Sequence, residues 1–287
     1  MSAQILSGTK LSKQIQQQIS KDIKQLIDNG KARPRLDVIL VGENKASQTY
    51  VKHKQQACKN VGITSICHKL CANTTENQLS KLIAELNNND DTSGILLQLP
   101  LPSHLDPNKF IELINPNKDV DGFHPISMGR LATKQPIMRP CTPYGVLKLL
   151  EQTNINMNGL HVVIIGASNI VGRPMALECL MLNCTVTVCH SATTDLKQHI
   201  SHADILITAI GNPNVIKSDW IKPGAIVIDV GFNHLADGSI RGDIDFNTAK
   251  ERASWITPVP GGVGPMTIAM LLQNTLLAAT LNCHPHT

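Results

Sequence analysis

Aromatic residues are scarce in this chain, and their scarcity limits what the protein can bind. Among its 287 residues are two tryptophans, two tyrosines and four phenylalanines. A surface that stacks the bases of a single-stranded nucleic acid needs several such rings along one groove. The formal net charge is only +4, and the basic residues are spread along the chain, whereas nucleic acids attract a concentrated basic patch. We therefore expect no nucleic-acid partner.

Signals for secretion, membrane insertion and metal binding are also lacking. The N-terminal sequence MSAQILSG contains neither the basic region nor the apolar region of a signal peptide. No segment approaches the roughly 18 apolar residues of a membrane span, so we expect no membrane association and a cytoplasmic protein. The eight cysteines form no C-x-x-C pair. Cysteine and histidine come closest together at 67–71 and 184–190, in apolar segments typical of buried thiols, so we expect no metal site.

The first half of the chain alternates apolar strand-like segments with amphipathic helical ones. Strands are predicted at 36–41, 63–70 and 94–100, and helices at 10–29, at 47–61 and after a capping-box spacing from Asn73 to Glu76. This alternation predicts a parallel sheet with helices on its faces. Prolines recur between residues 99 and 143, which predicts a loop-rich hinge with short helices before a helix at 143–153.

The segment HVVIIGASNIVGRP, at 161–174, predicts a nucleotide-binding turn. Residues 161–165 form a valine- and isoleucine-rich strand, Gly166 ends it, and Gly172 precedes a helix at 175–182. Backbone N–H groups at a helix N-terminus stabilise a diphosphate. The glycine pattern is a variant of G-x-G-x-x-G, with Ser168 at the middle position and the last glycine one position later.

Three further strands, at 185–189, 205–209 and 225–229, predict a doubly wound second domain of the Rossmann type. We therefore expect two α/β domains with a cleft between them. The first would span residues 1–140 and be joined by a C-terminal helix at 266–287, and the second would span residues 141–265. At 287 residues, the chain has the length that two domains of about 100–200 residues require.

Several polar residues stand where open α/β sheets place ligands. Tyr50 and Lys54 share one helical face, because they are four residues apart. Gln98 lies at the end of a buried strand, where its side chain needs a polar partner or a cleft. Asp119 and Asp121 flank a valine in the hinge. Each, taken alone, is also compatible with an ordinary helix lysine, a partly buried ring or a loop aspartate.

Six motifs, taken together, resemble the bifunctional methylenetetrahydrofolate dehydrogenase/methenyltetrahydrofolate cyclohydrolase family. They occur in the family's order over essentially the whole chain, and they are YVKHK (50–54), GILLQLPLP (94–102), KDVDG (118–122), PCTPYG (140–145), GASNIVGRP (166–174) and TPVPGGVGPMT (257–267). The resemblance implies oxidation of methylenetetrahydrofolate with NADP, followed by hydrolysis of the methenyl product to 10-formyltetrahydrofolate. It implies a role in one-carbon metabolism and a homodimer formed through the nucleotide domain. At this length we expect no fused formyltetrahydrofolate ligase domain.

The resemblance also assigns roles to residues. Lys54 matches the catalytic lysine, Gln98 would hold its ammonium group or a folate oxygen, Tyr50 would pack along the aminobenzoate ring, and Asp121 would accept N–H bonds from the pterin. Ser47 and the Pro260–Gly261–Gly262 segment are expected to contact the substrate. Cofactor contacts are expected from Gly166, Ala167, Ser168, Gly172, Arg173, His190, Ser191 and Phe232.

The residues after the second nucleotide strand favour NADP over NAD. NAD-selective Rossmann domains place Asp or Glu at this point to bind the ribose hydroxyls. Here the strand continues into His190 and Ser191, and the first acid is Asp195. Two departures from the family pattern are Ala167, where many relatives have arginine, and Phe232, where isoleucine is usual. Arg173 is the candidate to replace the missing arginine.

Two alternative functions remain open from the sequence. A two-domain dehydrogenase of the shikimate type would share the nucleotide half, but neither Gln98 nor the Asp-Val-Asp sequence. A non-catalytic NADP-binding protein would leave Lys54, Gln98 and Asp121 unused.

Overall fold

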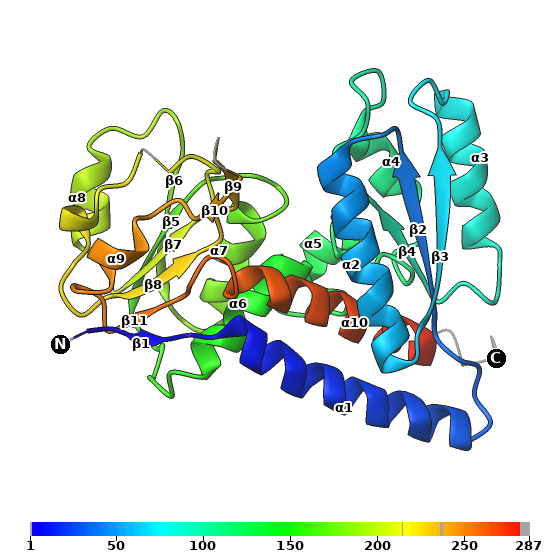
Figure 1. Ribbon diagram of the computed structural model, residues 1–287, viewed down its shortest axis with the longest axis horizontal. Coiled ribbons are helices and arrows are strands. Elements are labelled where there is room, and N and C mark those ends of the chain that lie inside the picture. Colours follow the sequence, from blue (N-terminus) through cyan, green and yellow to red (C-terminus); the bar gives the residue numbers. More distant parts are fainter. Residues whose placement is uncertain (1, 214, 236–237, 282–287) are drawn as a thin grey trace. The chain divides into compact units, whose positions relative to one another are not determined.

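The computed structural model describes residues 2–213, 215–235 and 238–281 (Figure 1). The chain divides into two compact units. Residues 14–141 and 268–287 form one, here called the three-stranded unit, and residues 1–13 and 142–267 form the other, the six-stranded unit. The chain passes between the units within α1 (Gly8–Asp28), at the start of α6 (Cys141–Glu151), and within α10 (Val263–Leu281).

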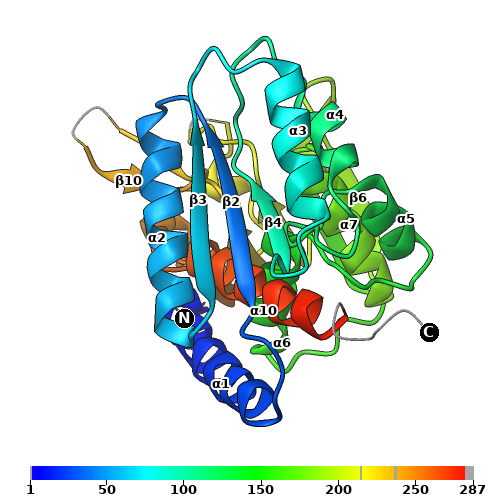
Figure 2. The same ribbon diagram turned by 90° about the vertical axis from the view of Figure 1, so that its right-hand side faces the viewer.

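The three-stranded unit contains a parallel sheet in the order β3-β2-β4. Its strands are β2 (Arg35–Val41), β3 (Thr64–Leu70) and β4 (Gly94–Leu97). Helices α2 (Lys45–Val61) and α3 (Glu76–Asn87) lie on opposite sides of the sheet (Figure 2), as right-handed crossovers in opposite directions require. Ile39 and Val41 pack with residues of α3 and with Phe110 of α4 (Pro107–Leu113). A short α5 (Pro125–Ala132) follows, so the proline-rich segment contains the expected short helices.

The capping box of α3 lies two residues beyond the predicted position. Thr75 is the N-cap: its hydroxyl accepts from the Gln78 N–H at 3.3 Å, and the Gln78 side chain accepts from the Thr75 N–H at 2.9 Å. The prediction of an Asn73–Glu76 box was therefore wrong. Thr75 has the extended backbone that an N-cap needs, and Glu76 is already the first helical residue.

The six-stranded unit contains a fully parallel sheet in the order β1-β11-β8-β7-β5-β6. Its two strands with the longest pairing are β5 (His161–Ile165) and β6 (Thr185–Cys189), both with the predicted bounds. The remaining strands are β7 (Ile205–Thr208), β8 (Ile226–Asp229), β11 (Trp255–Ile256) and β1 (Gln4–Ile5). The order reverses at β5, as in the predicted doubly wound fold, so β5 is the topological switch point.

Several short elements complete this unit. Helix α7 (Gly172–Met181) follows β5, and α8 (Leu196–Ser201) follows β6 (Figure 1). A 3-10 turn (Ser218–Trp220), the antiparallel pair β9 (Asn233–His234) and β10 (Ile240–Arg241), and α9 (Phe246–Ala249) come between β7 and β11. The core of the sheet lies in β5, β7 and β8, where every residue except His161 is buried.

The grouping of the chain ends differs from the predicted domain limits. Residues 1–13 belong with the six-stranded unit, because β1 pairs with β11 at the edge of that sheet. The prediction placed them in the first domain. The predicted C-terminal helix at 266–287 begins three residues earlier, at Val263, and residues 282–287 lie outside the described residues.

Helix α10 differs from the expectation that no segment approaches the length and apolar character of a membrane span. Among the described residues it is the one helix long and apolar enough, by length and composition, to cross a membrane. More than half of it is buried within the protein, and Met266, Met270 and Leu272 are fully buried. This burial is typical of a core helix in a protein with a large apolar interior.

Candidate functional site

Lys54 and Gln98 meet at the carboxyl end of the three-stranded sheet. The Lys54 Nζ donates to Gln98 Oε1 at 3.1 Å, and Gln98 Nε2 donates to the Leu99 carbonyl at 2.7 Å. The second bond fixes which end of the amide faces the lysine. Gln98 follows directly after β4, and its own N–H donates to the Ile39 carbonyl of β2. The amine is therefore held by a side chain that the sheet itself positions.

Helix α2 carries three of the predicted site residues, and its ends are well defined. Asn44 caps its N-terminus by accepting from the Ser47 N–H at 3.0 Å, and Gly62 ends it in the left-handed conformation. Ser47 is buried, and its hydroxyl lies 3.5 Å from the Leu99 carbonyl. Tyr50, one turn before Lys54, is 37% exposed, which leaves ring surface open to a ligand.

Asp121 lies in a turn that a buried aspartate organises. Asp119 accepts from the N–H groups of Gly122 (3.2 Å) and His124 (2.8 Å) and from the Ser127 hydroxyl (3.2 Å). Gly122 has φ +76°, and a Cβ there would lie 2.5 Å from the backbone of Arg139. Only glycine fits this position without strain, so the direction of the chain at Asp121 is fixed.

The environment of Asp121 favours a carboxyl group that titrates near neutral pH. Burial raises the pKa of Asp121 to about 6, the nearby Lys54 lowers it in part, and Asp119 raises it further. Asp121 keeps some accessible surface, so water and ligands reach it although protein surrounds it densely. The structure thus brings together three of the residues predicted from the sequence, Lys54, Gln98 and Asp121.

The sequence analysis did not identify the Asn274 side chain, which binds the backbone beside the Asp121 turn. Asn274 of α10 donates through Nδ2 to the carbonyls of Val120 and Arg139, both at 2.9 Å, and lies 3.6 Å from the Cys141 sulfur. Asn274 is buried. The detectable signal is the pair of amides Gln273 and Asn274 within the apolar sequence of the last helix, since an amide that is buried requires partners.

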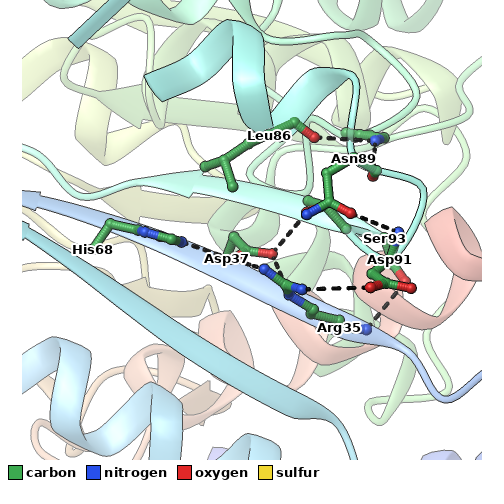
Figure 3. A network of polar contacts seen from close by, with 9 residues as sticks. Arg35, Asp37, His68, Leu86, Asn89, Asp91 and Ser93 are labelled. Carbon is green, nitrogen blue, oxygen red and sulfur yellow. Dashed lines mark hydrogen bonds and ion pairs between the residues drawn. The ribbon is translucent and has the colours of Figure 1, made fainter. Parts of the chain in front are cut away.

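A second polar network extends from the amino ends of β2 and β4 to His68 in β3 (Figure 3). Asp37 of β2 is completely buried and faces the Arg35 Nε and Nη2 (both 2.9 Å) and the His68 Nε2 (2.7 Å). The Thr92 hydroxyl donates to it at 3.0 Å. Because ligands of open α/β sheets bind at the carboxyl ends of the strands, we interpret this network as structural.

The turn between β5 and α7 in the six-stranded unit has the geometry of an anion site. Gly166 has φ +118°, and a Cβ there would lie 2.4 Å from the Ala209 carbonyl oxygen. A Cβ at Gly172 would lie 1.9 Å from the Gly166 oxygen. Helix α7 begins at Gly172, and the N-cap Val171 provides no side-chain cap, so an anion can approach the helix N-terminus.

The polar side chains around this turn suit an additional phosphate. Arg173 is exposed and donates through Nε to the Ala167 carbonyl at 3.1 Å, while Ser168 accepts from the Val171 N–H at 3.1 Å. His190 and Ser191 are exposed just after β6. Asp195, the first acid after this strand, is the N-cap of α8. No carboxylate at the end of β6 is therefore available to bind ribose hydroxyls.

The two remaining predicted segments lie elsewhere in the six-stranded unit. Phe232, after β8, is 40% exposed and makes an edge-to-face contact with His234. Gly261 has φ +103°, and its carbonyl accepts from the Thr9 N–H at 3.0 Å. A Cβ at Gly262 would lie 2.5 Å from the Pro258 oxygen. A left-handed backbone and close packing thus account for these two glycines within the unit. The substrate contact of the Pro260–Gly262 segment remains a prediction.

No group of three or more potential metal ligands occurs among residues 2–213, 215–235 and 238–281. The cysteine and histidine residues at 67–71 and 184–190 therefore form no such cluster in the described part of the chain. Each of the seven described cysteines is a free thiol.

Comparisons with known proteins cover both units. Residues 6–121 match the family description "Tetrahydrofolate dehydrogenase/cyclohydrolase, catalytic domain", and residues 140–283 match its "NAD(P)-binding domain". The chain is 57% identical over 279 residues to the Bifunctional protein FolD 1 of Hydrogenovibrio crunogenus, covering 97% of this chain and 98% of that protein.

Two solved structures have the same fold over nearly the full length. The bifunctional enzyme FolD-methylenetetrahydrofolate dehydrogenase/cyclohydrolase from Campylobacter jejuni has a TM-score of 0.96 at 49% identity, with 98% of this chain and 99% of that chain covered. The Trypanosoma brucei methylenetetrahydrofolate dehydrogenase-cyclohydrolase, complexed with NADP and an inhibitor, has a TM-score of 0.95 at 37% identity, with 98% of each chain covered.

Proposed function

Because the chain belongs to the tetrahydrofolate dehydrogenase/cyclohydrolase family, we propose that the residues described above divide the two reactions of that family between them. The enzyme oxidises 5,10-methylenetetrahydrofolate to 5,10-methenyltetrahydrofolate with NADP and hydrolyses this product to 10-formyltetrahydrofolate. The catalytic-domain match covers the half of the chain that a shikimate-type dehydrogenase would not share. The observation that supports the residue roles best is the Lys54–Gln98 hydrogen bond beside Asp121.

The oxidation needs positioning more than proton transfer. When bound, NADP accepts a hydride from the one-carbon bridge, and the remaining cation is delocalised over two folate nitrogens. Asp121 accepts two parallel N–H bonds from the amino-pyrimidine edge of the pterin. Tyr50 packs along the aminobenzoate ring, and Ser47 lines the same side of the site from the first turn of α2. These contacts fix the orientation of the folate and of its one-carbon bridge.

The hydrolysis needs a base, and Lys54 supplies it. Water attacks the methenyl carbon while the Lys54 amine takes one of its protons. The adduct then collapses with cleavage of the bond from this carbon to one folate nitrogen, N5, which receives a proton and leaves a formyl group on N10. A lysine amine accepts a proton only in its neutral form. Gln98 holds the amine in the attacking geometry.

The six-stranded unit holds the cofactor. Gly166, Ala167, Ser168 and Gly172 form the turn against which the diphosphate lies, at the N-terminus of α7. Arg173, His190 and Ser191 receive the 2′-phosphate, because Asp195 is engaged as a helix cap and no acid ends β6. Arg173 takes the place of the arginine that many relatives have at the position of Ala167. The backbone at Phe232 meets the nicotinamide amide.

We further propose a cytoplasmic homodimer formed through the six-stranded unit. Strand β6 is an edge strand of the described sheet, and unpaired edges favour association with a second chain. Leu180 of the neighbouring α7 is 48% exposed. Sedimentation analysis of the purified protein tests the dimer, and a monomer at micromolar concentration would contradict it.

The products would carry one-carbon units to purine, methionine and histidine biosynthesis.

One assay tests the function as a whole. The purified protein is mixed with methylenetetrahydrofolate and NADP, and NADPH formation is followed together with the methenyl chromophore. We expect folate-dependent NADPH formation, and we expect added methenyltetrahydrofolate to be hydrolysed without cofactor. Absence of both reactions in a folded protein would favour a non-catalytic NADP-binding protein. Reduction of NADP with shikimate in place of folate would favour the other alternative.

A further inference from the structure

Two buried carboxylates lie at the carboxyl end of the six-stranded sheet, and neither reaction above uses them. Asp229 is the last residue of β8 and is 4% exposed, and Asp243, after β10, is fully buried. A buried carboxylate is tolerated only when donors compensate the lost hydration. Here backbone N–H groups and neutral side chains are the donors, and their positions show what each carboxylate holds in place.

Asp243 binds the loop that follows β7. Its Oδ2 accepts from the N–H groups of Ile210 (2.8 Å) and Gly211 (3.2 Å), and its Oδ1 accepts from the Asn212 N–H (3.0 Å). Three consecutive amides thus converge on one carboxylate. Backbone loops usually bind an external anion with such an arrangement of N–H groups. Here the Asp243 carboxylate takes the place of the external anion and holds the loop.

Asp243 also binds the loop that follows β8. The Asn233 Nδ2 donates to Asp243 Oδ1 at 3.0 Å. A Cβ at Gly231 would lie 2.3 Å from the Asp243 carboxyl carbon. Gly231 and Asn233 flank Phe232, so the backbone there is fixed from both sides by contacts with one carboxylate.

Asp229 holds Asp243 in position. Its carboxylate accepts from the N–H groups of Asp243 (3.0 Å), Ile244 (2.9 Å) and Gly231 (2.9 Å) and from the Thr208 hydroxyl (3.2 Å). A Cβ at Gly242 would lie 2.1 Å from its Oδ2. Asp229 thus fixes Asp243, and Asp243 in turn fixes the loop after β7 and the loop after β8.

The position of these loops relative to the switch point indicates which part of the cofactor they face. In a doubly wound fold a dinucleotide lies across the carboxyl end of the switch-point strand, here β5. Its adenosine half extends towards β6, where His190 and Ser191 stand. Its nicotinamide half therefore extends towards β7 and β8, where the loops held by Asp243 begin.

We propose that Asp243 is a positioning residue for the nicotinamide half of the cofactor site. Its carboxylate fixes the backbone of Ile210–Asn212 and of Gly231–Asn233, and this backbone receives the nicotinamide. The proposal rests on the NADP-dependent function given above. The adenosine half of the site and the folate-binding residues of the three-stranded unit do not depend on Asp243.

The Asp243→Asn variant tests this division. An asparagine amide presents one acceptor oxygen and an NH2 group that opposes the converging N–H donors. We expect the NADP Kd, measured by calorimetry on the full-length protein, to rise about ten- to a hundredfold, the range for hydrogen bonds to a charged group. The Kd of 2′,5′-ADP, which contains only the adenosine half, should stay unchanged. Hydrolysis of methenyltetrahydrofolate in the absence of cofactor should also stay unchanged.

Amide hydrogen exchange provides a readout that needs no ligand. Exchange of the Ile210–Asn212 segment should accelerate in Asp243→Asn. Asp245→Asn is the matched control, since Asp245 lies two residues away, caps α9 and pairs with Arg241. It should leave the NADP Kd and the exchange of Ile210–Asn212 unchanged.

A milder variant covers the case in which Asp243→Asn does not fold. Asn233→Ala removes one donor only, and it should raise the NADP Kd several-fold while the 2′,5′-ADP Kd stays constant. An equal loss of both ligands, or unchanged NADP binding in a folded Asp243→Asn protein, would overturn the proposal. If the wild-type protein itself did not bind NADP, the proposed function would fail, and this outcome is distinct from the other two.

Discussion

The candidate site of the three-stranded unit is formed by side chains, whereas that of the six-stranded unit is formed mainly by backbone. In the three-stranded unit the proposed chemistry uses side chains, namely the Lys54 amine, the Gln98 amide and the Asp121 carboxylate. In the six-stranded unit it depends on backbone, at a turn where Gly166 and Gly172 leave no space for a Cβ. The two sites should therefore be sensitive to different mutations. A change of functional group should disable the site of the three-stranded unit, whereas an added carbon atom should disable the turn of the six-stranded unit.

Lys54→Met should produce the largest effect and isolate the side-chain site. Water attack on the methenyl cation needs a proton acceptor, so cyclohydrolase activity should fall by the 10²–10⁴-fold typical of a removed general base. Hydride transfer needs aligned rings only, so dehydrogenase activity should survive and methenyltetrahydrofolate should accumulate. A two-wavelength time course measures NADPH and the methenyl chromophore together.

Lys52→Met is the matched control, because Lys52 is an exposed lysine on the same helix, and it should leave both rates unchanged. Wild-type hydrolysis of added methenyltetrahydrofolate by Lys54→Met would exclude this lysine as the base. Equal loss of both activities in a folded variant would make it a binding residue.

Asp121→Asn should weaken folate binding in both reactions and leave NADP binding intact. The amide loses the charge and one acceptor of a paired contact, worth about 1.5–3 kcal/mol for a hydrogen bond to a charged group. Folate KM in the two assays and NADP affinity by calorimetry measure this. Asp28→Asn, at the exposed end of α1, is the control. Normal folate kinetics would move the pterin contact to Asp119 or out of this turn.

Asp121→Asn should weaken folate binding but raise the stability of the folded protein, because the pKa of Asp121 is raised. Burial holds the pKa near 6 in the folded protein, above its ordinary value of 3.8, so the folded state binds the proton more tightly than the unfolded state. Stability therefore falls as pH rises between these values, and the loss is complete above about pH 6. Asp121→Asn should stabilise the ligand-free protein at pH 7.5 by about 1–2 kcal/mol, allowing for partial exposure. Chemical denaturation at pH 4.5 and 7.5 measures the difference, which should shrink at the lower pH.

Gly166→Ala should break the backbone site without changing any functional group. The new Cβ would lie 2.4 Å from the Ala209 oxygen at φ +118°, so the turn must shift out of the geometry that receives the diphosphate. Restoring that geometry on binding costs about 1–3 kcal/mol, so NADP affinity should fall about fivefold to 150-fold. Gly159→Ala is the control, since Gly159 also has a positive φ, +77°, but its Cβ would meet no atom within 4 Å. If both variants bound NADP equally, the close approach to Ala209 would be irrelevant.

Ser191→Asp should have the smallest effect and define the phosphate position. A carboxylate near the 2′-phosphate should raise the NADP KM several-fold, because like charges repel. The enzyme should otherwise prefer NADP to NAD, and Ser191→Asn should keep that preference. Unchanged NADP affinity in Ser191→Asp would place the phosphate elsewhere, and equal kcat/KM with NAD in the wild type would contradict the cofactor assignment.

The sequence predicted most of the fold because local patterns carry the necessary information. Strands β5 and β6 match their predicted bounds, and the switch point follows from their alternation with helices. The contacts that join distant segments could not be predicted. Asp37 reads as a polar residue in a strand, and only the fold places His68 and Thr92 against it. Asn274 likewise gives no sign that its partners lie more than 130 residues earlier, at Val120 and Arg139.

The candidate site shows the same limit. Motifs single out Lys54, Gln98 and Asp121, but the Lys54–Gln98 hydrogen bond and the electrostatic influence of Lys54 on Asp121 depend on the fold, including the parallel register of β2 and β4. The sequence predicts substrate contacts at Gly261 and Gly262, and the structure adds that a Cβ at Gly262 would lie 2.5 Å from the Pro258 oxygen. A glycine indicates that space is needed, and the sequence does not say what fills that space.

Gly166 and Gly172 have no space for a Cβ, and this restricts the mutations by which the enzyme could become resistant to an inhibitor bound at this turn. A compound that mimics the diphosphate would bind backbone N–H groups, which every residue except proline provides. Replacement of either glycine would push a new carbon into a neighbouring carbonyl, and the mutant enzyme would lose its own cofactor along with the drug. Compounds that depend on the phenol of Tyr50, which is partly exposed, would face a residue that can change at lower cost to the fold. Inhibitors anchored at the glycine turn should therefore select resistant variants more slowly.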